Sequence, residues 1–550
     1  MGGRRAVQAP SEIPEEVIQE LRACLANRRI EHGFACLRSQ PSLVETVNVH
    51  QDNAARFIGH LAQWVDVGAL EPSKLKAVLG RFDAQTRAQL PFRDYLYLRM
   101  ADGMLAMSQE EIDSAIRHFS FVLEFPEELS DSQSTSIVYF WKARCLRRRG
   151  EYEQALEFAH MGRDSALALG APRMAALSQV LESWLLFQRG KLKEAENVSH
   201  QAESALRETD DYVTVGNIYS FYGRMARRAG RYEKAIECFN KAISEYRKRD
   251  PQHPNLARSL ANIALAKREI ALQLRRKIDL QAERRRKQGS KSSEATNVAA
   301  PRRRLQQLHD EIVQHLDEAT HIYGHHPNHH GIGTVQLNYA YVLLDDGDYH
   351  NAEVKARHAY RLGEEKQDYI LMGRARIVQC MIENARVEEE ISEGSDSGSH
   401  ARRAMEYIQE ALDFARHTQN QRLLANAYLW LGFTHCNAFF EDTDAAREAY
   451  DLAVSSRKGS TQSDNMADEL QRLKAKVLRA GSLDLKFKAW SQGQLGDKTF
   501  QQLTEEFAEL IIPRVWEREG RKVSRVATRL SISPKKVRRI LDRVGRRKPS

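Results

Sequence analysis

The chain has 550 residues, 42% of them hydrophobic and 29% charged, and a formal net charge of +9. This composition is typical of a folded soluble protein, and the length indicates several domains or a repeat array rather than one globular core. No apolar run approaches the roughly 18 residues that span a bilayer, so we do not expect a membrane protein.

The amino terminus, MGGRRAVQAPSEIPEE, lacks the apolar stretch of a secretory signal. Ala6 stands where a myristoylation motif needs Ser or Thr, so lipidation is not expected. The six cysteines show no CxxC spacing, and most lie in apolar helical patterns. Free cysteines of this kind are typical of a reducing compartment, so we expect a cytoplasmic protein.

Residues 1–90 read as helices without a clear repeat. Ser11 followed by Pro14 is typical of a helix start, and Pro41 and Pro72 divide the rest of this range into shorter segments. Terminal units of repeat arrays are usually atypical because one face meets solvent. We therefore predict a helical N-terminal cap over this range.

The stretch 219–242, YSFYGRMARRAGRYEKAIECFNKA, has apolar and small residues at helical spacing on both sides of a break at Gly230. It predicts two amphipathic helices joined by a tight turn. Similar turn motifs begin at Gly150 (GEYEQA) and Gly190 (GKLKEA), forty residues apart each time. This spacing predicts stacked helix pairs over residues 91–266.

The order of small and aromatic residues in this stretch resembles the tetratricopeptide (TPR) repeat. The matching residues are Gly223, Gly230, Tyr232, Ala235, Phe239 and Ala242. The period of forty exceeds the roughly 34 residues of that family, so we expect extended helices or connections. The resemblance implies an all-α, TPR-like α-solenoid of antiparallel helix pairs, with an ordinary helical bundle as the alternative.

Looser copies of the pattern lie on either side. They are Gly103 with Ala115 and Phe119, Gly347 in GDYHNAEVKARHA, and Gly432 with Ala446, Tyr450 and Ala453. Ala404, Ile408 and Ala411 fit a second helix, and the acidic stretch at 388–400 reads as a long loop in place of its turn. We predict TPR-like repeats and a capping helix, from about Asn465, within residues 321–490.

A basic segment at 267–320 lies between the two sets of repeats. A long helix is predicted to end near Gln288, with a loop and a restart at Pro301. Eleven basic and three acidic residues lie between Arg275 and Arg304. They indicate either a site for nucleic acid or an acidic partner, or a solvated helical hairpin or insertion within the array.

Five histidines lie within 321–330, in HIYGHHPNHH. Imidazole suits zinc, copper or nickel, but no thiolate is near, and Gly324 and Pro327 indicate a loop. A histidine-rich loop between repeats is therefore favoured over a metal site. We expect neither a metal nor a cofactor.

The carboxyl-terminal end is far more basic than the rest. Residues 521–550 contain twelve Lys or Arg and one acid, a net charge of +11. This leaves 71 basic and 73 acidic residues, or −2, for residues 1–520. One end of the chain is therefore suited to a polyanion. We predict a linker at 491–498 and a separate module at 499–550.

Three amphipathic helices are predicted in this module. Their apolar residues are Phe500, Leu503, Phe507, Leu510 and Ile511, then Val523, Val526, Ala527 and Leu530, then Val537, Ile540, Leu541 and Val544. Pro513 is expected to kink or end the first helix, whereas Ser533 and Pro534 are a natural N-cap and first residue for the last. Two short helices joined by a brief turn describe a helix-turn-helix.

The run KVSRVATRLSISPKKVRRILDRVG, which begins at Lys522, resembles the carboxyl-terminal DNA-binding domain of Fis-family regulators. Ser-Arg-x-Ala, Leu-x-Ile-Ser and a basic final helix match, whereas Ser531 departs from the Gly that is common in the turn. The resemblance implies DNA binding through residues 521–550 and leaves a homodimer open, although Pro513 lies in the helix of the family's dimer contact. The alternative is a basic amphipathic tail without a DNA role.

Helical geometry divides the cations of this module. At about 100° per residue, Lys535 and Arg539 lie opposite the apolar side of the last helix and should face base edges in a major groove. Flanking cations are better placed for phosphates. The candidate DNA-binding residues are Arg521, Lys522, Ser524, Arg525, Arg529, Ser533, Lys535, Lys536, Arg538, Arg539 and Arg543.

No Walker-type glycine loop, HExxH, GxSxG or carboxylate pair stands out, so we expect no enzymatic activity. We predict a DNA-binding transcriptional regulator, in which the concave surface of the solenoid binds a protein or peptide and the helix-turn-helix binds DNA. The alternative is a scaffold or adaptor whose basic tail tethers a complex to nucleic acid without sequence preference.

Overall fold

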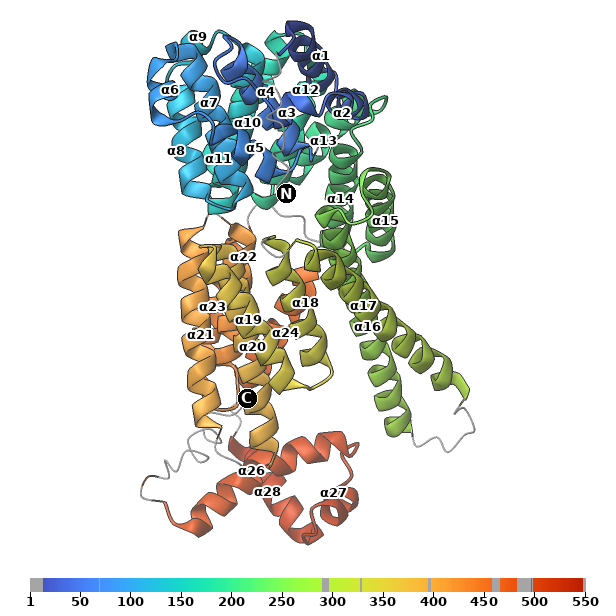
Figure 1. The fold of residues 1–550 in the computed structure, drawn as a ribbon. Coiled ribbons are helices and arrows are strands. Elements are labelled where there is room, and N and C mark those ends of the chain that lie inside the picture. Colours follow the sequence, from blue (N-terminus) through green and yellow to red (C-terminus); the bar gives the residue numbers. More distant parts are fainter. Residues whose placement is uncertain are drawn as a thin grey trace, which may run out of the picture. The chain divides into compact units, whose positions relative to one another are not determined.

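The structure is a computed structural model that describes residues 13–68, 70–288, 296–326, 329–393, 397–418, 420–457, 465–481, 496 and 498–547 (Figure 1). The chain divides into two compact units, unit 1 over Met1–Val477 and unit 2 over Leu478–Ser550. Every regular element in the described ranges is a helix, so the predicted all-α fold class is confirmed. None of these helices combines the length and apolar content that crossing a bilayer requires.

Unit 1 begins with six helices. They are α1 (Glu15–Ala26), α2 (Ile30–Ser39), α3 (Ser42–Glu45), α4 (Ala54–Asp66), α5 (Pro72–Leu79) and α6 (Ala84–Gln89). Helix α4 is the centre of this group because Phe57, Leu61 and Trp64 are completely buried. As the sequence predicts, α1 starts directly after Pro14.

Helix pairs come next along the chain. The first set is α7 (Phe92–Ser108) with α8 (Ile112–Leu123), the short α9 (Pro126–Leu129), α10 (Ser132–Arg149) with α11 (Tyr152–Ala168), α12 (Pro172–Gln188) with α13 (Leu192–Leu206), and α14 (Tyr212–Arg228) with α15 (Tyr232–Arg249). The second set is α16 (Pro254–Gln288) with α17 (Thr296–Gly324), α18 (Gly331–Asp345) with α19 (Tyr349–Glu365), α20 (Tyr369–Glu393) with α21 (Gly398–His417), α22 (Gln421–His435) with α23 (Thr443–Ser455), and the last helix α24 (Asn465–Gly481). Each pair packs on the next, so the predicted TPR-like solenoid is confirmed.

One turn geometry joins the helices of four pairs. The residues at these turns have φ angles between 71° and 86°, and they are Gly150, Gly190, Gly230 and Gly347. The residue after each glycine donates its backbone N–H to a carbonyl five residues earlier, for example Arg231 to Ala226 at 2.9 Å. This is a Schellman turn, which favours glycine because the left-handed backbone crowds a Cβ atom. The three evenly spaced turns predicted from the sequence are confirmed.

Replacing Gly230 by alanine is expected to destabilise unit 1 by about 1–2 kcal/mol because of the left-handed backbone. A Cβ atom there would meet nothing within 4 Å, so no steric clash adds to this cost. Gly80→Ala is the matched control, since Gly80 ends α5 with a right-handed φ of −65°. Urea unfolding followed by circular dichroism measures both variants, and equal losses would contradict the explanation.

Gly223 shows why small residues face aromatic ones in these pairs. A Cβ atom on Gly223 would lie 2.6 Å from the ring of Phe239, and Gly103 has the same relation to Phe119 at 2.5 Å. Both rings are completely buried. The backbone of the first helix therefore packs directly on an aromatic ring of the second.

The turn after α10 also contacts a distant part of unit 1. A Cβ atom on Gly150 would lie 3.2 Å from the Cβ of Thr418, the residue that follows α21. Nearby, Asn420 donates from Nδ2 to the hydroxyl of Tyr152 at 3.5 Å, across 268 residues of sequence. Two repeat pairs far apart in the array are thus in direct contact.

Helices α16 and α17 form one pair with long outer ends (Figure 1). Their inner parts belong to the core, where Leu260 of α16 and Leu316 of α17 pack in one cluster with Tyr246 of α15. Helix α16 ends at Gln288, as predicted, but α17 already begins at Thr296. The predicted restart at Pro301 is therefore too late.

The acidic stretch 388–400 is mostly helical, in contrast to the loop that its composition predicts. Helix α20 runs to Glu393, and α21 begins at Gly398. The extension of α20 has a partner, because Glu388 lies 2.6 Å from the Nζ of Lys476 on α24. The second helix predicted here is present as α21, with Ala404, Ile408 and Ala411 buried.

Unit 2 contains α26 (Phe500–Arg518), α27 (Val523–Arg529) and α28 (Pro534–Arg547). Its core consists of the buried residues Ile512, Val526, Ala527, Val537 and Ile540. The described residues of the predicted apolar faces of α27 and α28 therefore lie in or against the core, whereas the side chain of Val544 lies outside the described part. The predicted linker at 491–498 lies largely outside the described residues.

Helix α26 differs from its prediction in two ways. It continues through Pro513, so the proline does not end it. Phe500 is 86% exposed and Phe507 is 47% exposed, so the predicted apolar face of its first half is not buried. The residue that α26 buries is Ile512, and Ala508, Val515 and Trp516 pack against the same core.

Candidate functional site

A groove of about 990 Å³ lies in unit 1. Most of its walls come from α10, α12, α14, α16, α18, α20 and α22, which are the first helices of their pairs. The last helix α24, adjoining turns and a few residues of second helices complete them. This is the surface expected for the concave side of a stacked repeat array.

Arginines dominate the groove, which we call the arginine groove. Its basic residues are Arg147, Arg148, Arg149, Arg224, Arg227, Arg228, Arg258, Arg268, Lys366, Arg374 and Arg422. Several lie in the last turns of α10 and α14, where the helix dipole favours a cation. Eight acidic residues also line the groove, so its formal charge is 11 − 8 = +3.

Some of these cations are held by carboxylates. Arg148 pairs with Glu110, and Arg268 donates to the two carboxylate oxygens of Asp345 at 2.5 and 2.8 Å. These pairs fix their guanidinium groups against the wall of the groove. Because these carboxylates already bind them, Arg148 and Arg268 are less available to a ligand.

Other cations have no carboxylate within ion-pair distance in the described part of the chain. Arg147 covers the ring of Trp184 at 4.9 Å, and Arg227 and Arg374 make no ion pair among the described residues. The pKa of Arg147 is lowered to about 9 and that of Arg227 to about 10, first by burial and then by neighbouring arginines. Both remain protonated at pH 7.

The pKa values of two half-buried acids in the groove are shifted upward. Burial raises the pKa of Asp368 and of Glu469, although neighbouring arginines act against it.

The histidine-rich segment lies partly at this groove rather than in a separate loop. Helix α17 includes His321, and His330 lines the groove. His329 and His330 stack with ring centroids 4.4 Å apart, and burial lowers the pKa of both rings, so both are neutral at pH 7. No three of the segment's histidines bring ligand atoms together in the described residues.

A different set of residues has metal-ligand types. Glu20, Cys24 and His32 place one ligand atom each within 4.8 Å of one another. Glu20 and His32 are already hydrogen-bonded at 2.9 Å, and burial raises the pKa of the Cys24 thiol to about 12. A thiol with that pKa opposes thiolate ligation at neutral pH.

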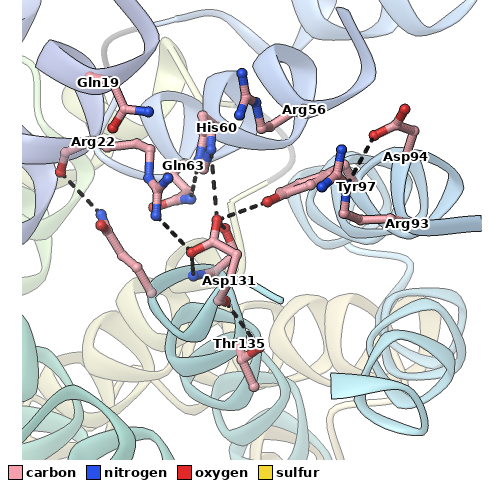
Figure 2. A network of polar contacts seen from close by, with 12 residues as sticks. Gln19, Arg22, Arg56, His60, Gln63, Arg93, Asp94, Tyr97, Asp131 and Thr135 are labelled. Carbon is pink, nitrogen blue, oxygen red and sulfur yellow. Dashed lines mark hydrogen bonds and ion pairs between the residues drawn. The ribbon is translucent and has the colours of Figure 1, made fainter. Parts of the chain in front are cut away.

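A buried polar network joins four helices of the N-terminal part (Figure 2). Asp131, the N-cap of α10, accepts hydrogen bonds from Arg22 of α1 at 2.8 Å and Tyr97 of α7 at 2.9 Å. His60 of α4 lies 3.8 Å from the same carboxylate, and Ser134 donates to it at 2.7 Å. These residues do not line the arginine groove, so we assign the network to stability.

Unit 2 presents most of the predicted DNA-binding residues to solvent. The exposed ones are Arg521, Lys522, Ser524, Arg525, Arg529, Ser533, Lys535, Lys536, Arg538 and Arg539. Val537 and Ile540 are buried on the other side of α28, as its periodicity predicts. Lys535, Lys536, Arg538 and Arg539 therefore point away from the core side of α28.

Three of these arginines are engaged by acids of α26 and the turn after it. Arg543 donates to Glu505 at 2.8 Å and Glu509 at 3.2 Å, Arg539 lies 3.6 Å from Glu505, and Arg529 pairs with Glu519. Arg543 would have to exchange two carboxylates to contact a phosphate. No local sequence pattern indicates this, because its two partners lie 38 and 34 residues upstream.

The turn before α28 contains a residue with a left-handed backbone. Ser531 has a φ of 52°, a conformation that favours glycine. Ser533 accepts a hydrogen bond on Oγ from the backbone N–H of Lys536 at 3.2 Å, and α28 begins at Pro534. The predicted N-cap is confirmed.

Comparison with known families gives one match. Residues 214–272 match the tetratricopeptide repeat. This range covers most of α14, all of α15 and the first half of α16, and it includes the Gly230 turn. No curated protein sequence matches the chain.

Several solved structures are similar to this chain at low sequence identity. A Rap protein complexed with Competence and Sporulation Factor is 14% identical, covers 73% of this chain and 99% of its own, and has a TM-score of 0.50. The apo quorum sensor NprR from B. thuringiensis is 14% identical, with coverages of 63% and 98% and a TM-score of 0.39. A human IFIT1 dimer with m7Gppp-AAAA is 15% identical, with coverages of 86% and 96% and a TM-score of 0.42. At these identities the likeness to the Rap protein concerns the fold alone.

Proposed function

We propose that the chain is a transcriptional regulator without enzymatic activity, which binds a protein or peptide segment in unit 1 and DNA through unit 2. The observation that carries the first half is the arginine groove, a large concavity walled by the first helices of the repeats. Concave repeat surfaces commonly hold extended peptides or helices. The Rap protein of similar fold was solved with a bound factor, which supports the same use of the array.

The second half rests on the cationic outer side of α27 and α28. Lys535, Lys536, Arg538 and Arg525 are exposed, and they make no ion pair in the described part of the chain. Together with the Fis resemblance of residues 522–545, this supports docking of α28 in the major groove. The six free cysteines support the expected reducing, cytoplasmic compartment.

Arg539→Ala is expected to weaken discrimination between operator and random DNA by about 1–3 kcal/mol, because a base-reading arginine is lost. Lys536→Ala is expected to weaken the binding of operator and random DNA alike, because a phosphate contact is lost. It should also lower the slope of log affinity against log salt concentration by about one. An operator is first selected from a random duplex pool, and affinities are then measured at two salt concentrations.

Arg543→Ala serves as the control for this pair, because Glu505 and Glu509 already engage that guanidinium. It is expected to change DNA affinity less than either exposed cation. Equal affinity of the unchanged chain for all duplexes would favour the second candidate, an adaptor that is tethered to nucleic acid without sequence preference. The density of cations in unit 2 would suffice for such a tether.

A further inference from the structure

The arginine groove also specifies the chemistry of its occupant. Resting on the proposed function of unit 1, we infer that the groove takes an extended acidic peptide segment, whose carboxylates pair with Arg147, Arg227 and Arg374. The partner is thus a protein tail or peptide with several Asp or Glu residues, or with one of these and a free carboxyl terminus.

The first observation is the arrangement of the cations that form no ion pair among the described residues, although Glu269 acts on Arg227 and Asp368 on Arg374 from a distance. Arg227 of α14 feels the charges of Arg422 on α22 and Arg374 on α20. Arg147 of α10 feels those of Arg148 and of Arg258 on α16. Cations from opposite walls therefore gather at two places in one groove, which is the arrangement that several carboxylates along one strand of peptide would match.

The second observation is the cost of this arrangement in the free protein. Arg147, Arg224 and Arg227 lie near other arginines in a half-buried site. Burial and mutual repulsion both lower their pKa values, so the charged state of each side chain is disfavoured in the free protein. Carboxylates would relieve the repulsion and form charge-assisted, bidentate hydrogen bonds with guanidinium groups. A neutral or basic peptide would leave the repulsion in place.

The third observation distinguishes a peptide from single-stranded nucleic acid. Basic grooves that bind single strands combine cations with open aromatic faces on which bases stack. Three of the rings that line this groove are covered by its own arginines, and two of them are Trp184, under Arg147 at 4.9 Å, and Tyr341, under Arg268 at 4.8 Å. Phe187 is likewise covered by Arg228 at 5.1 Å.

The acidic residues of the groove also favour a peptide over a nucleic acid. Asp368, Glu469 and Glu269 lie among the cations of the groove. They would repel a continuous row of phosphates, whereas a peptide places its carboxylates at intervals and presents backbone N–H donors between them. The volume of about 990 Å³ lies at the upper end of small-ligand pockets, which suits a peptide segment better than a single small acid.

The test uses the full chain with Lys535→Ala, Lys536→Ala and Arg538→Ala, which lower the binding of anions by unit 2 by the same amount in the groove variant and in its control. The probes are fluorescein-labelled hexaglutamate, hexaglutamine and hexathymidylate, followed by fluorescence anisotropy. The groove variant adds Arg227→Gln and Arg374→Gln. The matched control adds Arg117→Gln and Arg402→Gln, two exposed arginines on the second helices α8 and α21.

We expect hexaglutamate to bind more tightly than either other probe, and to lose about tenfold in affinity for each groove arginine removed. The control variant should keep its affinity within about twofold. Neither groove arginine forms an ion pair in the described structure, so the variant should retain its melting temperature.

Three results would overturn the inference, and they bear differently on the proposed function. If hexaglutamine binds as tightly as hexaglutamate and the groove variant loses both, the groove binds peptides but has no preference for acidic ones. Tighter binding of hexathymidylate that is lost in the groove variant would make the groove a nucleic-acid site and would also overturn the proposed role of unit 1. Equal loss of hexaglutamate binding in the groove and control variants would mean that surface charge alone attracts it.

Discussion

Asp131→Ala is expected to destabilise unit 1 by about 3–5 kcal/mol, because it leaves buried partners without their carboxylate. The side chain of Asp131 is 5% exposed, and it receives hydrogen bonds from Arg22 and Tyr97 in addition to capping α10. Its loss would break the connection among α1, α4, α7 and α10 in one step (Figure 2). The urea midpoint of unfolding, followed by circular dichroism, measures the effect.

Asp113→Ala is the control for this substitution. Asp113 is 57% exposed and pairs with Arg149 at 3.2 Å on the surface, so its loss should cost less than about 1 kcal/mol. Asp131→Asn should fall between the two, since it keeps the shape and some hydrogen bonds but removes the charge. A loss at Asp131 no larger than that at Asp113 would contradict the role assigned to the network.

Acid is expected to destabilise unit 1 between pH 6.5 and 4 through the buried ring of His60. Burial lowers the pKa of His60 to about 4 and outweighs the attraction of the Asp131 carboxylate, whereas the unfolded chain has an ordinary histidine pKa near 6.5. As the pH falls from 6.5 to 4, the unfolded state binds a proton that the folded state does not. The stability that the neutral ring contributes above pH 6.5 is thus lost progressively, up to about 3 kcal/mol at pH 4.

His60→Gln should flatten the dependence of the unfolding midpoint on pH between 6.5 and 4. His32→Gln is the control, because its ring is 58% exposed. His253 acts in the same direction as His60, since burial also lowers its pKa to about 4, so some slope should remain in the His60 variant. Identical slopes in both variants and the unchanged chain would show that His60 is not responsible.

The sequence predicted the repeats well because their determinants are local. A turn glycine at positive φ and a small residue under an aromatic ring leave a periodic signal, which Gly230 and Gly223 with Phe239 illustrate. The same holds for α28, where Val537 and Ile540 mark the buried side.

The site was harder to predict because its determinants are distant in sequence. Arg147 and Arg227 read as ordinary cations at helix ends, and only the curvature of the stack brings them to one groove with Arg374. The sequence predicts that Arg543 contacts a phosphate. In the structure α26 packs beside α28, and Arg543 instead donates to Glu505 and Glu509. The basic runs at 147–149 and 224–228 are the signal that a search for cationic ends of first helices would have found.

The contact between the turn after α10 and the residues after α21 changes how unit 1 should come apart. In a simple array each repeat touches only its neighbours, so the ends fray independently and the middle persists. Here Gly150 lies against Thr418, and Tyr152 accepts a hydrogen bond from Asn420, so early and late repeats share one junction. If the two ends of unit 1 are pulled apart, this junction must break before the helices between residues 150 and 418 can separate. We therefore expect those helices to unfold in one cooperative step rather than repeat by repeat.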